Sequence, residues 1–167
     1  RDGEYIFDVG ETDLTWKAEK IVGGHDGVVA VKEGTAIYAE WKLIGGSAVI
    51  DMTTIKSTDN GGNESLDGHL KSEDFFDVEN HEEATINVTE LVDNGDGTYN
   101  VKADLTIKGI TNPQEFVVVE TENGFTAEIV IDRLAYDIIY NSGNFFEDLG
   151  DKAIKDEFTM NLDAVLQ

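Results

Sequence analysis

VKADLTIK, residues 101–108, decides the fold class, because its odd positions are apolar and its even positions are polar. Side chains of a β-strand alternate between two faces, so this stretch predicts a strand with one dry and one wet face. FTMNLDA, residues 158–164, repeats the pattern with the even positions apolar, and Ala127, Ile129 and Ile131 form a third such set. One dry and one wet face is typical of an antiparallel sheet, so we predict an all-β fold.

Turns containing glycine are predicted between the alternating runs. The first turn is placed at Glu33-Gly34, between Val28–Lys32 and Thr35–Leu43, and the second at Gly45-Gly46, between Thr35–Leu43 and Ser47–Ile55. The third is placed at Asp93–Gly97, between Ala84–Val92 and Thr98–Lys108. The fourth is placed at Asn123-Gly124, between Glu115–Thr121 and Phe125–Ile131. Asn-Gly is the strongest of these signals, because a type I′ turn needs positive φ at both central residues. About ten strand-like runs are present, and no amphipathic helix is long enough for a parallel crossover.

Two stretches depart from the alternation. Asn63–Ser72 predicts a short helix with Asn63 as its N-cap and with Leu66 and Leu70 on one face. Asn144–Lys155 is mixed and predicts a loop or a short helical turn. Residues 1–167 contain no repeat, linker or low-complexity tract, so we predict a single domain.

Two architectures fit such a sheet, a sandwich of two sheets or one sheet closed into a barrel. Several runs are nine to eleven residues long, against about five or six in an average strand. Long antiparallel strands in hairpin order favour a closed barrel, which leaves no exposed edges. An eight-stranded barrel is either filled by its own side chains or holds one small ligand, and periodicity leaves both open.

The acidic charge of the chain argues against several classes of partner. Thirty-five Asp and Glu against twelve Lys and Arg give a formal net charge of −23. Nucleic acids and anionic membrane surfaces are not expected partners, because both attract clustered cations. We interpret the excess acid as solubilising surface rather than as a specific binding face. No stretch is long and apolar enough to predict a membrane-spanning helix, and no cysteine is present to form a disulfide.

No motif for catalysis or metal binding is found in the sequence. His25, His69 and His81 lack His-x-x-x-His or Glu-x-x-His spacing, so no zinc site is predicted. Asp93–Gly97 lacks the later ligands of an EF-hand and is interpreted as a hairpin turn. Nucleophile-elbow, P-loop and dinucleotide-binding patterns are absent, so no enzyme is predicted.

The aromatic residues have simple structural interpretations. Trp16 and Trp41 are expected in the core or at the rim of the barrel. Phe75 and Phe76 follow a charged stretch and are expected to plug one end of the barrel or to act as a lid there.

Four stretches carry a resemblance to a known family. LDGHLKSEDFFDVENHEEAT, residues 66–85, contains a His-Leu-Lys-Ser step, an Asp-Phe-Phe segment and a strand opening with Ala-Thr. HDGV (25–28), IDMTTI (50–55) and LTIKGITNP (105–113) agree with it, as do the weaker late features Asp132-Arg133 and Asp156-Glu157. From Tyr5 to Leu166 the chain resembles the YceI-like family, the lipocalin-like polyisoprenoid-binding proteins. His81-Glu82 stand where that family usually has Tyr-Pro, a departure that concerns the local turn and not the fold.

This resemblance implies an extended antiparallel eight-stranded lipocalin-like barrel with a short helix near one end. It implies that the interior binds an isoprenoid lipid, such as a quinone or a prenyl lipid, for transport or storage, and that no reaction is catalysed and no cofactor is required. It also implies a periplasmic or extracellular location after removal of a leader, with a lipoprotein anchor as a further option. A homodimer is left open.

The predicted site has an apolar lining and a polar mouth. The lining residues are Val101, Ala103, Leu105, Ile107, Ala127, Ile129, Ile131, Phe158, Met160, Leu162, Phe75 and Phe76, and the mouth residues are His69, Lys71, Arg133 and His25. Each lining residue could instead be ordinary packing in a filled barrel. Because the net charge opposes an anionic head, we expect a neutral head such as a quinone.

Three alternatives remain at this stage. The chain could be a filled-barrel interaction or stress protein without lipid, or it could deliver its lipid to a membrane enzyme. A hydrolase or isomerase would need titratable groups that converge inside the barrel.

Overall fold

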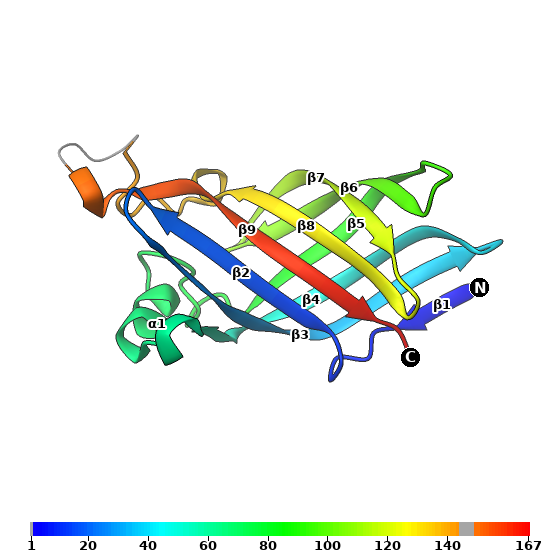
Figure 1. The fold of residues 1–167 in the computed structure, drawn as a ribbon, viewed down its shortest axis with the longest axis horizontal. Helices are drawn as coiled ribbons and strands as arrows, with labels where there is room; N and C mark the ends of the chain where they lie inside the picture. Colours follow the sequence, from blue (N-terminus) through cyan, green and yellow to red (C-terminus); the bar gives the residue numbers. More distant parts are fainter. Residues whose placement is uncertain (1, 144–148) are drawn as a thin grey trace.

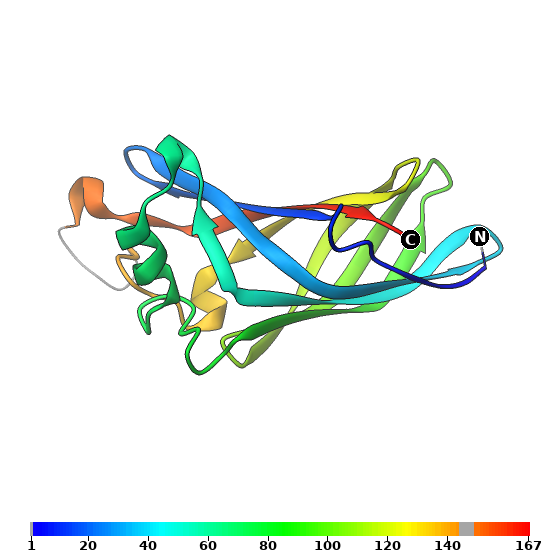
Figure 2. The same cartoon turned by 90° about the horizontal axis from the view of Figure 1, so that it is seen from below.

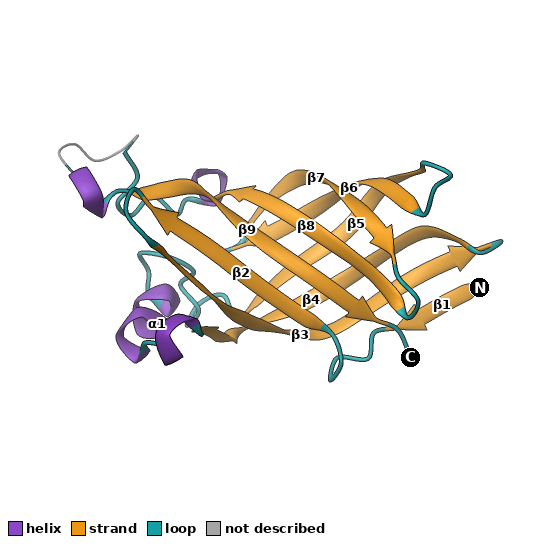
Figure 3. Cartoon of the chain, viewed as in Figure 1, coloured by secondary structure: helices purple, strands orange, loops and turns teal. Residues whose placement is uncertain are grey.

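The computed structural model describes residues 2–143 and 149–167, and strands dominate it (Figure 1, Figure 3). In these residues the strands are β1 (Gly3–Ile6), β2 (Asp13–Lys20), β3 (Gly24–Ala39), β4 (Lys42–Ser57), β5 (Glu83–Asp93), β6 (Thr98–Ile107), β7 (Ile110–Glu120), β8 (Gly124–Asp132) and β9 (Ile154–Val165). Between them lie an α-helix, α1 (Glu64–Lys71), and the 3₁₀ turns η1 (Asp59–Gly61), η2 (Arg133–Tyr136) and η3 (Gly150–Lys152). Of the predicted loop or turn over Asn144–Lys155, residues 144–148 lie outside the described part of the chain, and η3 follows them.

The sheet closes on itself. Hydrogen-bonded neighbours follow the order β3-β2-β9-β8-β7-β6-β5-β4, and β4 pairs back with β3. All these pairings are antiparallel. β1 is not a ninth strand of the closed barrel. It pairs with residues 35–38 of β3, beyond the residues 24–28 of β3 that pair with β2. The predicted eight-stranded antiparallel barrel is therefore confirmed, and the sandwich is ruled out.

The barrel is elongated, and its two ends differ (Figure 1, Figure 2). α1 and the 3₁₀ turns gather toward one end, which we call the helix end. The tips of the β3–β4, β5–β6 and β7–β8 hairpins lie toward the other end, the hairpin end, together with both termini. A short helix near one end of the barrel was predicted and is confirmed.

The predicted inward faces of three strands point into the barrel. The buried residues are Val101, Ala103, Leu105 and Ile107 on β6, Ala127, Ile129 and Ile131 on β8, and Phe158 and Met160 on β9, while Leu162 on β9 is half-buried. All of them belong to or pack against one continuous apolar cluster. Alternation along a strand was thus sufficient to identify these inner faces.

Two of the predicted glycine turns are wrong. β3 runs without interruption through Glu33-Gly34, and Gly45-Gly46 lies inside β4. The hairpin instead turns at Glu40 and Trp41, whose φ angles are 51° and 69°. A Cβ on Gly34 would overlap the ring of Phe7, so this glycine makes room for a neighbouring side chain. Glycines within a strand often mark such a close approach.

The other two predicted turns are correctly placed. Asp93–Gly97 joins β5 to β6, with Asp93 Oδ1 accepting a hydrogen bond from the Gly95 N–H at 2.8 Å. Asn123-Gly124 joins β7 to β8, but neither residue has positive φ, so the predicted type I′ conformation is wrong. A Cβ on Gly124 would overlap the carbonyl oxygen of Ala164, which explains the glycine without any turn requirement.

The tryptophans have opposite environments. Trp16 is buried in the core, as expected, and its indole N–H donates to the Val28 carbonyl oxygen at 3.3 Å. Trp41 is 77% exposed, so the expectation of a core or rim position is wrong for this residue. Its place in the two-residue turn of the β3–β4 hairpin directs its side chain away from the barrel.

Candidate functional site

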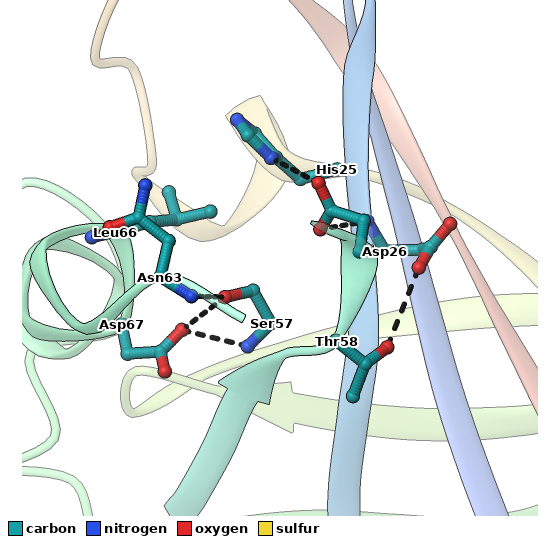
Figure 4. Close-up of polar contacts among 8 residues, drawn as sticks. His25, Asp26, Ser57, Thr58, Asn63, Leu66 and Asp67 are labelled. Atoms are coloured by element: carbon teal, nitrogen blue, oxygen red, sulfur yellow. Dashed lines mark hydrogen bonds and ion pairs between the residues drawn. The ribbon is translucent and has the colours of Figure 1, made fainter. Parts of the chain in front are cut away.

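α1 is fixed across the helix end by polar contacts with the end of β4 (Figure 4). Asp67 Oδ1 accepts hydrogen bonds from both the N–H and the hydroxyl of Ser57, at 2.7 and 2.8 Å. The Asn63 N–H donates to the Ser57 hydroxyl at 2.9 Å, and the Asn63 side chain caps the helix by accepting from the Leu66 N–H. The predicted N-cap is confirmed. These contacts turn Leu70 toward the barrel, where it is buried.

The neighbouring turn η1 is fixed to β3. Asp59 Oδ2 lies 2.9 Å from His25 Nδ1, and its other oxygen accepts from the Asp26 N–H at 3.2 Å. The hydrogen bond to His25 is the main reason why the pKa of Asp59 is lowered. His25 and Asp26 lie beside the end of β4 in Figure 4, where Asp26 also contacts Thr58.

An aromatic group lies beside α1. The His69 ring packs edge-on against Phe75 and Tyr140, with ring centroids 4.9 and 4.7 Å apart. His69 Nε2 also lies 2.9 Å from Asp74 Oδ2. Phe76 packs edge-on against Phe158 of β9, with the ring centroids 6.1 Å apart. Phe75 and Phe76 therefore lie at the helix end, where a plug was predicted.

Arg133 is buried rather than open to solvent. Its guanidinium donates to four backbone carbonyl oxygens, those of Ile138, Tyr140, Ile154 and Lys155, at 2.8 to 3.0 Å. Burial lowers its pKa, and the nearby carboxylates of Asp156 and Asp132 oppose that shift. Because four of its five N–H donors are already used, Arg133 mainly ties the segment after η2 to β9.

In the part of the barrel that the structure describes, one cavity lies inside toward the helix end and another toward the hairpin end. The helix-end cavity, of about 60 Å³, is lined by Trp16, Ala18, Val29, Ile50, Met52, Ile55, Leu70, Phe75, Phe76, Ala84, Leu105, Ile107, Arg133, Ile138, Ile154, Lys155, Phe158 and Met160. The hairpin-end cavity, of about 80 Å³, is lined by Phe7, Leu14, Val31, Thr35, Ala36, Leu43, Gly45, Gly46, Ser47, Ala48, Ile50, Ile86, Val88, Leu91, Val101, Leu105, Phe116, Val118, Phe125, Ala127, Ile129, Ile131, Met160 and Leu162. A water molecule needs about 10–15 Å³, so each cavity has room for a few waters or a short apolar group.

A third, more open pocket lies outside the helix-end cavity. Five residues line both this outer pocket and the helix-end cavity: Trp16, Ala18, Leu70, Phe75 and Ile154. The remaining lining of the outer pocket is mostly polar: Glu19, Lys20, His25, Leu66, His69, Tyr140, Asn141 and Lys152. The helix end thus combines an outer pocket, which includes several polar and charged side chains in its lining, with an apolar interior directly behind it.

The described walls of the interior cavities are mostly apolar and contain no pair of side chains suited to acid–base catalysis. Among the described residues that line them, none is a histidine, aspartate or glutamate. The charged lining residues are Arg133 and Lys155, both at the helix-end cavity. Proton transfer by side chains needs a titratable group within hydrogen-bond reach of the substrate. Such a lining is suited to holding an apolar group.

Most predicted lining residues face one of the cavities, and their role in ligand binding stays a prediction. The predicted residues that line the helix-end cavity are Leu105, Ile107, Phe158, Met160, Phe75 and Phe76. Those that line the hairpin-end cavity are Val101, Leu105, Ala127, Ile129, Ile131, Met160 and Leu162. Ala103 is fully buried but lines neither cavity. It lies opposite Val88 in the β5–β6 ladder and belongs to the apolar core cluster.

The predicted polar mouth is only partly assembled. His25 and His69 line the outer pocket. Arg133 lies inside, at the helix-end cavity, because its guanidinium is bonded to backbone carbonyls. Lys71 lines none of the three pockets, since it follows the buried Leu70 on α1 and is turned away.

The sequence pattern did not reveal the lining that comes from β2 to β5. It includes Trp16, Val29, Ile50, Met52 and Ala84. Register shifts interrupt the β3–β4 ladder at three places, and these disturb a strict period of two. Ile50 and Met52 are nevertheless separated by the polar Asp51, and that alternation could have identified part of the inner face of β4.

None of the helices in the described ranges has both the length and the apolar character needed to cross a membrane. Within the same ranges, no group of three or more acidic or histidine side chains is placed to hold a metal ion.

A closed antiparallel barrel with an apolar interior is the architecture of lipocalin-like proteins. Residues 5–166 match the YceI-like domain, so the chain belongs to the YceI-like family, and the resemblance seen in the sequence is confirmed.

Relatives of this chain include proteins described only as UPF0312 proteins. One from Vibrio campbellii is 37% identical over 76 residues, which cover 46% of this chain and 36% of the relative. One from Staphylococcus aureus is 42% identical over 66 residues, covering 40% of this chain and 36% of the relative. The matched stretches thus span only about a third of these relatives.

Solved structures share the fold at low sequence identity. Burkholderia cenocepacia BcnA has a TM-score of 0.75 at 20% identity, covering 96% of this chain and 99% of that one. A polyisoprenoid binding domain from Saccharophagus degradans, described as implicated in plant cell wall breakdown, has a TM-score of 0.67 at 14% identity, covering 100% and 99%. The Campylobacter jejuni YCEI protein has a TM-score of 0.60 at 15% identity, covering 83% and 84%.

Proposed function

We propose that this chain binds a long apolar isoprenoid-type lipid, such as a quinone or a prenyl lipid, inside the barrel and carries or stores it without catalysing a reaction. The observation that carries the proposal is the succession of three neighbouring spaces along the barrel, an outer pocket that includes several polar side chains and two apolar cavities behind it. The polyisoprenoid binding described for the Saccharophagus degradans domain, which has the same fold, supports this choice of ligand.

The energetics favour an apolar chain in this interior. Each CH₂ group that moves from water into an apolar site gains about 0.8 kcal/mol. An isoprenoid tail consists almost entirely of such groups, so affinity needs no polar contact along the tail. The cavities together hold far less than a long tail, so binding requires interior side chains to move apart.

We place the lipid head in the outer pocket at the helix end, because this pocket includes several polar side chains and shares five residues with the cavity behind it. A neutral head is favoured over a diphosphate. Several side chains at this end that could contact an anion already have carboxylate partners: His25 with Asp59 at 2.9 Å, His69 with Asp74 at 2.9 Å, and Lys155 with Glu19 at 2.8 Å. A diphosphate would compete with these carboxylates and would approach a chain of net charge −23.

Native mass spectrometry of the purified chain, before and after incubation with menaquinone, tests the proposal. We expect a complex with one lipid per chain and recovery of the same lipid on solvent extraction. A clean lipid-free mass under both conditions would instead support the alternative of a filled-barrel interaction protein, which the small cavity volumes favour.

The preference for a neutral head is tested by competition. Menaquinone and a prenyl diphosphate with a tail of matched length are offered together at physiological salt. We expect menaquinone to be retained. Tighter retention of the diphosphate would contradict the preference, and Lys20 and Lys152 of the outer pocket would then be the first positions to neutralise.

We also propose export to the periplasm or the cell exterior, which the resemblance to the family implies. Fractionation of the native host with an antibody against this chain tests it, and recovery only with the cytoplasm would contradict it.

A further inference from the structure

The two interior cavities meet at a waist. Three residues line both of them: Ile50 of β4, Leu105 of β6 and Met160 of β9. All three are buried, at 6%, 2% and 9% exposure. Because each contacts both spaces, these three side chains lie between the cavities.

The waist is formed from opposite walls of the barrel. In the closed order of eight strands, β9 stands directly across from β5, and β4 and β6 flank β5. Met160 therefore projects from one wall toward Ile50 and Leu105 on the other. Side chains that meet across the interior in this way close a barrel at one level.

The strand register places the boundary between the cavities at the same residues. Met160 pairs with Trp16, which lines the helix-end cavity, and with Ile129, which lines the hairpin-end cavity. Ile50 likewise pairs with Ala84 on the helix-end side and with Val31 on the hairpin-end side. Four pairings, two at Met160 and two at Ile50, thus locate the same division.

Met160 is the movable member of the waist. Methionine is unbranched and has three rotatable side-chain bonds, so it adapts to the shape of a neighbour more easily than isoleucine or leucine does. Its side chain is therefore the member of the waist that yields most easily to a chain passing between the two cavities.

We propose that the waist of Ile50, Leu105 and Met160 controls the passage of a long isoprenoid chain from the helix-end cavity into the hairpin-end cavity. This inference rests on the proposed lipid-binding function. A short chain occupies the helix-end cavity alone, whereas a long chain displaces Met160 and continues into the hairpin-end cavity.

The test compares the binding of geraniol, farnesol and solanesol, which are neutral prenyl alcohols of increasing length. Met160→Trp fills the waist, and Met160→Ala opens it. Met52→Ala is the matched control, because Met52 is the only other methionine of the chain and lines the helix-end cavity alone. Ile50→Phe fills the waist from the opposite wall, in case Met160→Trp does not fold, and circular dichroism checks the fold of each variant.

For the wild-type chain we expect affinity to rise from geraniol to solanesol. Filling the waist should leave the affinity for geraniol within about twofold of the wild-type value and should weaken the affinity for solanesol at least about tenfold. The reason is that each CH₂ excluded from the interior costs about fourfold in affinity. Met160→Ala should bind solanesol at least as tightly as the wild type and exchange it faster. Met52→Ala should change the affinities for the short and long alcohols by similar factors.

Two contradictory results are distinguishable. Folded waist-filling variants that bind solanesol as well as the wild type does would overturn the waist, and so would a wild-type affinity that is independent of chain length. A wild-type chain that binds none of the three alcohols would overturn the proposed function itself.

Discussion

Tyr99 on β6 is a buried phenol with two polar partners near the hairpin end. Its hydroxyl accepts a hydrogen bond from the Leu43 N–H at 3.1 Å and donates to Glu120 Oε1 at 2.7 Å. Burial is the main cause that raises its pKa to about 12, and the Glu120 carboxylate adds to the shift. The hydroxyl thus links β6 to both β4 and β7 as long as it keeps its proton.

Tyr99 should make the fold sensitive to alkaline pH. Its pKa is about 10 in the unfolded chain and about 12 in the fold, so its contribution is fully present below about pH 10 and is lost as the pH rises toward about 12. Tyr99→Phe should lose about 1–3 kcal/mol at neutral pH, because the Leu43 N–H loses its acceptor, and should show a shallower alkaline decline. Urea unfolding of both proteins from about pH 8 to about pH 12 measures this. Parallel curves over that range would contradict the assignment.

Arg133 acts through geometry rather than charge alone. Arg133→Lys keeps the positive charge but cannot reach four carbonyl oxygens at once, so we expect a loss of at least about 2 kcal/mol in the free energy of unfolding. Lys102→Gln, an exposed change on β6, serves as the control and should stay within about 0.5 kcal/mol of the wild type. An Arg133→Lys variant as stable as the control would show that the carbonyl contacts contribute little.

At the scale of elements, the long β3–β4 hairpin shows how glycine was misinterpreted. Its glycines at positions 34, 45 and 46 resemble turn residues in the sequence, yet all three lie inside strands. A sequence shows that a side chain is missing, but it does not show which distant side chain occupies the space. In this case Phe7, a residue far earlier in the chain, lies against Gly34.

Gly34→Ala tests this explanation against a matched glycine on the partner strand. A Cβ at position 34 would overlap the buried ring of Phe7, whereas the nearest atom to a Cβ at position 45 is Ile37 Cδ1, at 3.9 Å. We expect Gly34→Ala to cost about 1–3 kcal/mol and Gly45→Ala to stay within about 1 kcal/mol of the wild type. Thermal unfolding of the two variants, measured in parallel with the wild type, compares these losses in stability. Equal effects would mean that Gly34 is not a packing requirement.

The later strands were predictable because their alternation is unbroken. Val101 to Ile107, Ala127 to Ile131 and Phe158 to Leu162 face inward as expected. The same pattern found less than a third of the residues that line the two cavities, and it left out Ile50 and Trp16, whose strands have register shifts in their pairing with β3 and β9. The waist could not be predicted at all, because it depends on which strands stand opposite each other in the closed barrel.

At the scale of the whole molecule, the net charge of −23 was clear from composition. Which partners each positively charged side chain contacts was not. Arg133 was expected at a polar mouth and instead lies buried among backbone carbonyls. Composition gives the sum of charges, and only tertiary structure shows which of them remain available to a ligand.

The excess of negative charge should destabilise the fold at low ionic strength. Charges repel over about 30 Å at 0.01 M salt but over only about 3 Å at 1 M. We therefore expect the urea midpoint to rise with sodium chloride over this range, because screening relieves repulsion that is stronger in the compact state. A midpoint that falls or stays constant would show that the acidic residues are too dispersed to matter.

The interior site is tested most directly through Trp16. Trp41 is 77% exposed at a hairpin tip, so Trp41→Phe leaves a folded chain whose single tryptophan, Trp16, is buried and lines the helix-end cavity. Fluorescence of this variant is followed while menaquinone, whose ring quenches a nearby indole, is added. Binding in the barrel predicts quenching of Trp16 that saturates at one lipid per chain. Trp16 emission that stays unchanged at saturating menaquinone would contradict lipid binding inside the barrel.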